Sequence, residues 1–329
     1  MDTLIIKIML KIHLLIICLL LAMPAISGEH PGQDAFVRRA VQDQGLDQDL
    51  VTGLLANARY QQSIIDAITR PAEAKPWYEY RPIFLTRERI DLGVEFWRDN
   101  KDLIRQASLR SEVDESIIVA IIGVETKYGR ITGSYRVLDA LATLGFYYPK
   151  RAEFFANELL EFIRLGQEEN LPHREVKGSY AGAMGLGQFI PSSYRAYAVD
   201  FDGDGQRDLW RSAADAIGSV ANYFNAHHWK MGQPVAMPAA VTGDLGRFDE
   251  MKPKPSSSVG EIEQMGLTAD RCLDPGIAAS VQVLEQKNAK DYWLTFHNFY
   301  VITRYNRSPL YAMAVFQLSE EIKARMENG

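Results

Sequence analysis

Cysteine is almost absent from this chain. Its 329 residues include two cysteines, Cys18 and Cys272, and Cys18 falls within an apolar N-terminal leader. Removal of that leader would leave Cys272 alone, so no disulfide could form within the mature chain. The fold must therefore be stabilised by its hydrophobic core, for which a content of 47% hydrophobic residues provides enough material.

The chain also lacks an excess of positive charge. Lys and Arg number 36 against 42 Asp and Glu, which gives a net charge of −6. Because proteins that bind nucleic acid usually carry a basic patch, we expect no nucleic-acid partner. The chain contains no Gly-Lys-Ser/Thr sequence, so its glycine-rich stretch does not indicate a phosphate-binding loop.

The longest apolar stretch lies at the N-terminus and is typical of an export signal. Lys7 and Lys11 form a cationic start, and an apolar run from Leu14 to Ile26 follows and ends in small residues. We therefore predict a signal peptide at residues 1–27. The alternative is an uncleaved membrane anchor, although the run is short for a membrane span. No small residue precedes Cys18, so we expect no lipid anchor.

Helical periodicity dominates the rest of the chain. Apolar residues recur at steps of three and four, which predicts helices over 34–70, from Thr86 onward, and over 112–127, 152–165, 213–229 and 308–326. The proline-rich segment 70–82 is expected to cross between helices without being helical. Residues 237–290 collect Pro, Ser, Gly and Lys, and β-like runs at 280–286 and 291–305 predict a small strand-containing part.

A single carboxylate stands at the end of a helix that has no polar face. Residues 117–124 are apolar on all sides, which indicates a buried helix, and Glu125 follows just before Tyr128 and Gly129 stop it. Burial and the negative end of the helix dipole both disfavour the ionised form, so we predict a raised pKa for Glu125, as a general acid needs. The alternative is a Glu125 that pairs with a neighbouring cation or reaches solvent.

The glycine-rich stretch GSYAGAMGLGQF (178–189) combines close backbone approach with neutral polar groups. Ser179, Tyr180 and Gln188 can form hydrogen bonds, and Phe189 offers a flat apolar face. Sugars have apolar faces and many hydroxyls, so this combination favours a sugar-binding groove. The alternative is close helix packing through small residues.

An acidic loop resembles the start of a calcium-binding loop. In DFDGDGQRDLW (200–210), carboxylates occupy loop positions 1, 3 and 5, and glycine occupies position 6. Position 12 is Arg211 where a bidentate Glu is usual, so another carboxylate must complete the site. The expected ligands are Asp200, Asp202, Asp204, the carbonyl of Gln206, and either Asp208 or Asp215. One such loop favours a structural Ca²⁺ over a calcium sensor, and the alternative is an acidic turn without an ion.

Five motifs in this order resemble one family, the lytic murein transglycosylases of the B type. They are GVETKYGR, SYAGAMGLGQFIPSSY, VDFDGDG…DLW, DAIGSVANYF and TRYNRSPLYAMAV, within residues 34–322. The resemblance implies a mainly α (α+β) protein, with a lysozyme-like core, an accessory helical domain and a small β-containing domain. The corresponding ranges are a helical N-terminal segment at 28–80, a core at 81–236 with a calcium loop at 200–215, the β-containing domain at 237–290, and a return to the core at 291–329.

The resemblance also implies a reaction. Such enzymes cleave the β-1,4 bond between N-acetylmuramic acid and N-acetylglucosamine in peptidoglycan and leave a 1,6-anhydromuramic end. The expected cofactor is one Ca²⁺, with no organic cofactor. The expected partners are glycan strands and cell-wall synthesis or remodelling proteins, and we expect a periplasmic monomer. Competing hypotheses are a hydrolysing lysozyme-type enzyme, a non-catalytic glycan-binding module and a calcium-regulated scaffold.

The family's site residues are carried over through these motifs. The catalytic acid falls on Glu125, and the calcium ligands fall on the acidic loop, with Asp215 as the completing carboxylate. A basic pair falls on Lys150 and Arg151, where Lys at the first position argues against a bidentate contact with a substrate carboxylate. The glycan-contacting positions fall on Ser179, Gln188, Phe189, Tyr223, Tyr305, Asn306, Tyr311 and, more loosely, Tyr80.

Overall fold

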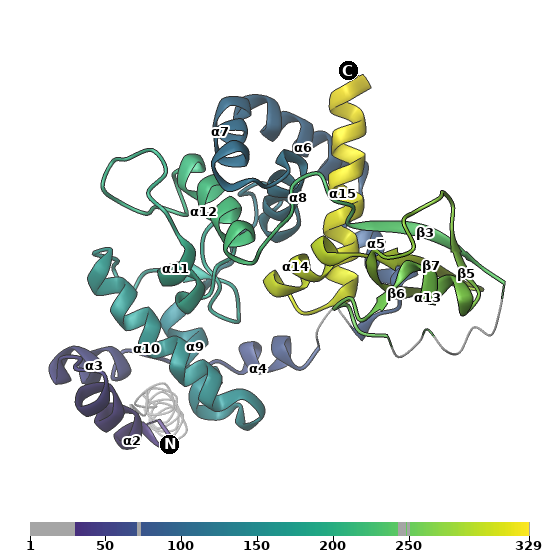
Figure 1. Ribbon diagram of the computed structural model, residues 1–329. Coiled ribbons are helices and arrows are strands. Elements are labelled where there is room, and N and C mark those ends of the chain that lie inside the picture. The colour runs from purple at the N-terminus through teal and green to yellow at the C-terminus, as the bar shows by residue number, and fades with distance from the viewer. Residues whose placement is uncertain (1–29, 71–73, 243–247, 249–250, 329) are drawn as a thin grey trace, which may run out of the picture. The chain divides into compact units, whose positions relative to one another are not determined.

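The computed structural model describes residues 30–70, 74–242, 248 and 251–328 (Figure 1). The predicted signal peptide lies outside these residues. Within the described part of the chain, no helix is both long enough and apolar enough to cross a membrane. The chain divides into two compact units, residues 1–57 and 58–329.

The described part of the first unit is helical. It contains α2 (Gln33–Arg38), the π-helical turn η1 (Arg39–Asp43) and α3 (Gln48–Leu55). The Asp47 carboxylate begins α3 by accepting a hydrogen bond from the Leu50 amide at 2.7 Å, a standard way to satisfy a free N–H at a helix start. The prediction that residues 34–70 are helical is correct, and the structure divides this range into several short helices.

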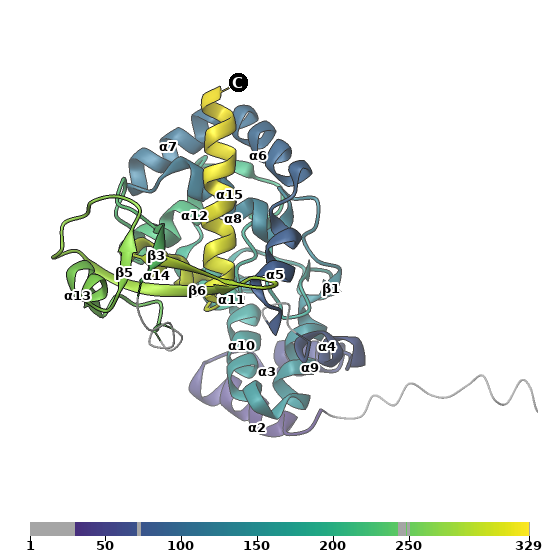
Figure 2. The same ribbon diagram turned by 90° about the vertical axis from the view of Figure 1, so that its right-hand side faces the viewer.

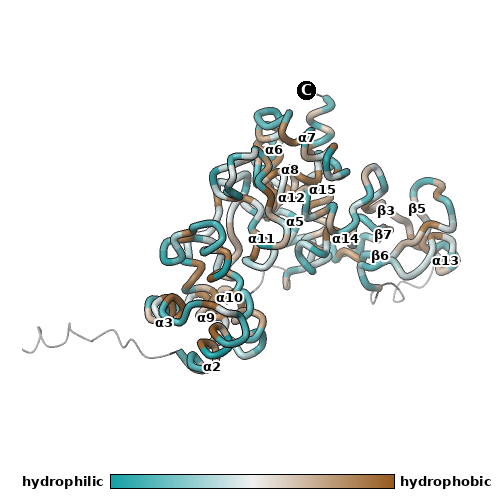
Figure 3. Tube along the Cα trace, turned by 60° about the vertical axis from the view of Figure 1, so that its left-hand side comes forward, coloured by the Kyte–Doolittle hydropathy of each residue, from teal (hydrophilic) through white to brown (hydrophobic). Residues whose placement is uncertain are grey.

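Helices form most of the second unit. They are α4 (Gln62–Ile68), α5 (Trp77–Phe84), α6 (Arg87–Asp99), α7 (Lys101–Ser111), α8 (Glu115–Thr126), α9 (Val137–Tyr147), α10 (Ala152–Glu168), α11 (Pro191–Tyr197), α12 (Ala213–Ala226), α14 (His297–Tyr305) and α15 (Pro309–Asn328), with a 3₁₀ turn, η3, at Pro149–Arg151. Helix α8 lies at the centre and contacts α6, α7, α12 and α15 (Figure 2). Ten of its twelve residues are buried, as its apolar sequence predicts, and its trace is coloured mainly hydrophobic in Figure 3.

The prediction that segment 70–82 is not helical is wrong for its last part. Helix α5 begins after Pro76 and contains Pro82. Proline removes one backbone donor from a helix interior and usually breaks it. Here Trp77 and Tyr80 are each 1% exposed, so burial of two large aromatic side chains outweighs the lost hydrogen bond.

A five-stranded antiparallel sheet forms the β-containing part. The strands are β3 (Ala236–Val241), β4 (Ser257–Ser258), β5 (Leu267–Ala269), β6 (Ala278–Glu285) and β7 (Lys290–Thr295), in the order β4-β6-β7-β3-β5. Met237 pairs with Leu294, and both lie in the apolar cluster that includes Ile262 of α13 (Val259–Gln264). Trp293 alternates to the opposite face of the sheet.

The prediction of a β-like run over 291–305 is correct only to Thr295. Residues His297–Tyr305 form α14, whose buried residues include Asn298, Val301 and Ile302. Spacings of three and four place these residues on one face of a helix. Burial of that face outweighs the β propensity of the aromatic and branched residues. The sheet itself extends to Thr295, five residues beyond 290.

Candidate active site

The catalytic candidate stands where α8 ends. Lys127, Tyr128 and Gly129 all adopt left-handed backbone angles, with φ of 50°, 58° and 84°, which turn the chain away immediately after the helix. Glu125 is therefore half-buried at the helix C-terminus. Lys127 directs its ammonium to Glu88, at 2.7 Å.

Tyrosines from three other helices gather around Glu125. The Tyr311 hydroxyl of α15 donates a hydrogen bond to Glu125 Oε1 at 2.5 Å. Burial, and then the negative charge of Glu125, raise the pKa of Tyr311 and of Tyr305 well above the ordinary value. Tyr80 of α5 adds to the rise of the Tyr311 pKa. Tyr305 and Tyr311 therefore remain protonated, and Tyr311 donates its hydrogen bond to the carboxylate.

The glycine-rich loop lies against the same aromatic group. The Tyr305 hydroxyl donates to the Gly187 carbonyl at 2.5 Å, and the Tyr223 hydroxyl donates to the Arg304 carbonyl at 2.6 Å. The Phe189 ring centre lies 5.8 Å from the ring centres of both Tyr223 and Tyr305. The predicted aromatic residues therefore form one cluster, which includes the loop.

Thr126, which the sequence analysis does not single out, ties this loop to the catalytic helix. Its side chain is 1% exposed. Its hydroxyl donates a hydrogen bond to the Leu186 carbonyl at 2.9 Å and accepts one from the Gly129 amide at 3.0 Å. The Leu186 amide in turn donates to the Leu209 carbonyl, at 2.8 Å. A buried hydroxyl directly after the acid is the sequence signal that could have identified it.

Three predicted polar residues shape the loops on which they stand. The Ser179 hydroxyl accepts from the Ala181 and Ala183 amides, at 3.2 and 3.0 Å. Gln188 adopts φ 50° and donates its side-chain amide to the Gly185 carbonyl at 2.9 Å. Asn306 accepts from the Ser308 amide at 3.0 Å. Their contacts with a glycan stay predictions.

The predicted basic pair is exposed on η3. The Arg151 guanidinium lies 4.2 Å from the centre of the Phe154 ring. Lys150 and Arg151 directly precede α10. Their role toward substrate carboxylates stays a prediction.

The acidic loop brings three carboxylates together. Asp200, Asp202 and Asp204 each present an oxygen within 4.8 Å of the others. All three donors are hard oxygens, so the residues fit a Ca²⁺ ion. Asp215 is not in this group of three, and its two oxygens accept from the Phe201 and Asp208 amides, each at 2.8 Å. Burial raises the pKa of Asp215, and its place as a ligand stays a prediction.

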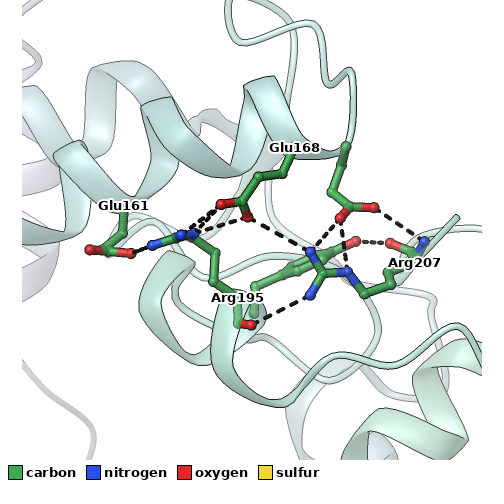
Figure 4. A network of polar contacts seen from close by, with 6 residues as sticks. Glu161, Glu168, Arg195 and Arg207 are labelled. Atoms are coloured by element: carbon green, nitrogen blue, oxygen red, sulfur yellow. Dashed lines mark hydrogen bonds and ion pairs between the residues drawn. The ribbon is translucent and has the colours of Figure 1, made fainter. Parts of the chain in front are cut away.

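An ion-pair network anchors the acidic loop to the neighbouring helices (Figure 4). Arg195 of α11 binds Glu161 and Glu168 of α10, the latter at 2.6 Å. Arg207, at the end of the loop, donates its Nε to Glu169 at 2.8 Å. Hydrogen bonding by Arg195 lowers the pKa of Glu168. The loop is thus fixed at its end to α10, independently of any ion.

The fold and the site define a mainly helical protein with one carboxylate in a frame of tyrosines and a glycine-rich loop. A family model described as "Transglycosylase SLT domain" matches residues 28–320. The chain therefore belongs to the SLT transglycosylase family, which confirms the resemblance and the fold class.

Three relatives illustrate the similarity. The chain is 41% identical over 305 residues to membrane-bound lytic murein transglycosylase B of Escherichia coli (strain K12). The matched region covers 89% of this chain and 83% of that protein. The chain is 46% identical to the soluble lytic transglycosylase SltB1 of Pseudomonas aeruginosa, with a TM-score of 0.83, covering 91% of this chain and 100% of that chain. It is 40% identical to E. coli lytic transglycosylase Slt35 in complex with calcium, with a TM-score of 0.81 and coverage of 90% and 94%.

Proposed function

We propose that this chain is a lytic transglycosylase that cleaves the β-1,4 bond between N-acetylmuramic acid and N-acetylglucosamine in peptidoglycan and forms a 1,6-anhydromuramic end. The observation that carries the proposal is the hydrogen bond between Glu125 and Tyr311 within the aromatic frame. In the group formed by Glu125, Phe189 and the tyrosines, Glu125 is the one carboxylate. Glycosidases that hydrolyse their substrate generally need two.

One carboxylate suffices when the substrate supplies the nucleophile. Glu125 donates its proton to the glycosidic oxygen while the bond from that oxygen to muramyl C1 breaks. The muramyl N-acetyl group stabilises the positive charge that develops at C1. The Glu125 carboxylate then takes the proton of the C6 hydroxyl as its oxygen bonds to C1. The ring closes, Glu125 is protonated again, and no water is consumed.

The surrounding residues bind and orient the glycan. Phe189 and Tyr223 are only 2% and 6% exposed, so they support the glycan-contacting loop from within the aromatic cluster. Ser179 and Asn306 orient the N-acetyl group through their polar side chains. Tyr311 stabilises the carboxylate formed after the first proton transfer, because a hydrogen bond donated to a carboxylate favours its charged form.

The acidic loop binds one Ca²⁺ as a structural ion. Asp200, Asp202 and Asp204 supply side-chain oxygens, the Gln206 carbonyl adds another, and Asp215 completes the set or fixes the loop through its two amide contacts. The substrate class implies that the chain acts in the periplasm after export by its leader. This location agrees with the murein-directed names of the relatives.

Digestion of purified peptidoglycan tests the reaction. Wild-type protein and the Glu125→Gln variant are incubated with sacculi, and the released muropeptides are weighed by mass spectrometry. We expect products one water lighter than hydrolytic products, and none from the variant. Products with reducing ends would indicate a hydrolase, and glycan binding without any product would indicate a binding module.

A further inference from the structure

A cavity in the second unit lies outside the proposed catalytic group. It has a volume of about 830 Å³ and lies among α5, α15 and strands β3 and β7. Figures 1 and 2 both show β3 beside α15. The cavity lies against the sheet where the paired residues Pro238 and Trp293 stand.

The cavity does not open toward Glu125 along α15. At 3.6 residues per turn, Phe316 and Glu320 point roughly 140° and 180° away from Tyr311 around the helix axis. Phe316 and Glu320 line the cavity, and Tyr311 binds Glu125. The cavity and Glu125 therefore lie on different sides of α15.

The lining combines aromatic side chains with an excess of carboxylates. The Trp293 and Phe316 rings meet edge to face, with centres 6.2 Å apart. Four carboxylates line the cavity against two guanidinium groups. One of those two belongs to Arg81, whose Nε donates to the Gln317 side chain at 2.8 Å. The carboxylates are those of Asp270, Asp291, Glu320 and Glu321.

We infer that this cavity binds an extended, lysine- or arginine-bearing segment of a protein partner. Carboxylates at the rim attract the cationic heads, and Trp293 and Phe316 can receive the aliphatic stems and the cation–π contact. A second cavity of about 500 Å³ shares Pro238, Asp291 and Trp293. The two cavities together follow β3 and β7, which suits an extended segment better than a compact ligand. The inference does not depend on the proposed reaction.

Titration of the mature chain with short peptides tests the inference. The probe is an acetylated octapeptide of alternating Lys and Ser, and the matched peptide has Gln in place of Lys. We expect the Lys peptide to bind roughly tenfold more tightly in calorimetry, with an affinity that falls as salt rises. The double variant Glu320→Gln/Glu321→Gln and the variant Trp293→Ala should each weaken binding about fivefold or more. Both variants should still digest peptidoglycan, which shows that they are folded.

The control is Glu95→Gln/Asp99→Asn on α6, which removes the same charge from exposed positions outside this cavity. It should leave the affinity within about twofold of wild type if the effect is local. Equal losses in both double variants would mean general attraction to an acidic protein and would overturn the inference. Absence of binding at millimolar peptide would also overturn it. A third outcome would also overturn the inference: Trp293→Ala abolishes binding of a soluble muropeptide but leaves binding of the Lys peptide unchanged.

Discussion

Replacement of Thr126 by valine removes one hydroxyl next to the catalytic candidate and little else. Valine keeps the branched shape and the buried methyl group. The Leu186 carbonyl and the Gly129 amide lose the partners that lie 2.9 and 3.0 Å away. A buried polar group left without its partner costs about 1–3 kcal/mol, so we expect the free energy of unfolding to fall by about 2 kcal/mol.

The same hydroxyl fixes the turn after Glu125 to the glycine-rich loop, so catalysis should suffer as well. We expect kcat on purified peptidoglycan to fall roughly tenfold, equivalent to about 1.4 kcal/mol of activation free energy, with a smaller change in KM. The control is Thr126→Ser, which keeps the hydroxyl and loses a methyl group. Serine should retain most of kcat while losing about 1 kcal/mol of stability. A valine variant with wild-type kcat and reduced stability would show that the contact only stabilises the fold, and the reasoning about catalysis would fail.

Three further predictions concern separate parts of the molecule. Tyr311→Phe removes the donor to Glu125, so kcat should fall roughly tenfold to a hundredfold. The alkaline limb of the pH–rate profile, where the general acid loses its proton, should move to higher pH, because the carboxylate loses a bond worth about 1.5–3 kcal/mol. Burial raises the pKa of Glu158 despite its bonds from Ser192. The pKa of Glu158 is then higher in the folded state than in the unfolded state. The stability that Glu158 contributes at low pH is therefore lost as the pH rises from the unfolded pKa through the folded pKa. Urea titrations should accordingly show Glu158→Gln gaining stability relative to wild type from about pH 4.5 upward; a pH-independent difference would contradict this. Chelation of calcium should lower Tm in calorimetry, and Asp204→Asn should abolish the rise on adding calcium back, because an ion that binds the folded state stabilises it.

The elements that the sequence predicts well are those whose local pattern and tertiary role agree. The run from 117 to 124 is apolar on every side, and α8 is accordingly central and buried. The acidic loop is equally local, since the spacing of Asp200, Asp202 and Asp204 is enough to place their oxygens near one another. Where local pattern and burial disagree, the prediction fails. Helix α5 forms around Pro82 because Trp77 and Tyr80 are buried, and no local rule contains that information.

The pairing of Glu125 with Tyr311 could not be derived from periodicity, because 186 residues separate the two positions. The family resemblance assigned both residues to the site without saying that they touch. The role of Thr126 is hidden from the local sequence for a related reason. A threonine at a helix end is usually unremarked, and its importance depends on the carbonyl of Leu186, which a distant loop supplies.

The choice of tyrosines as neighbours of Glu125 bears directly on how one acid can perform both proton transfers. A second carboxylate nearby would raise the pKa of one member of the pair by charge repulsion and could activate water. Phenols whose pKa values lie well above 10 stay neutral and donate throughout the physiological range. Tyr311 stabilises the Glu125 carboxylate between the two proton transfers of the proposed reaction without competing for the proton. In the proposed reaction Glu125 is the one carboxylate among these groups. The proton that it gives to the leaving oxygen is replaced from the C6 hydroxyl of the substrate.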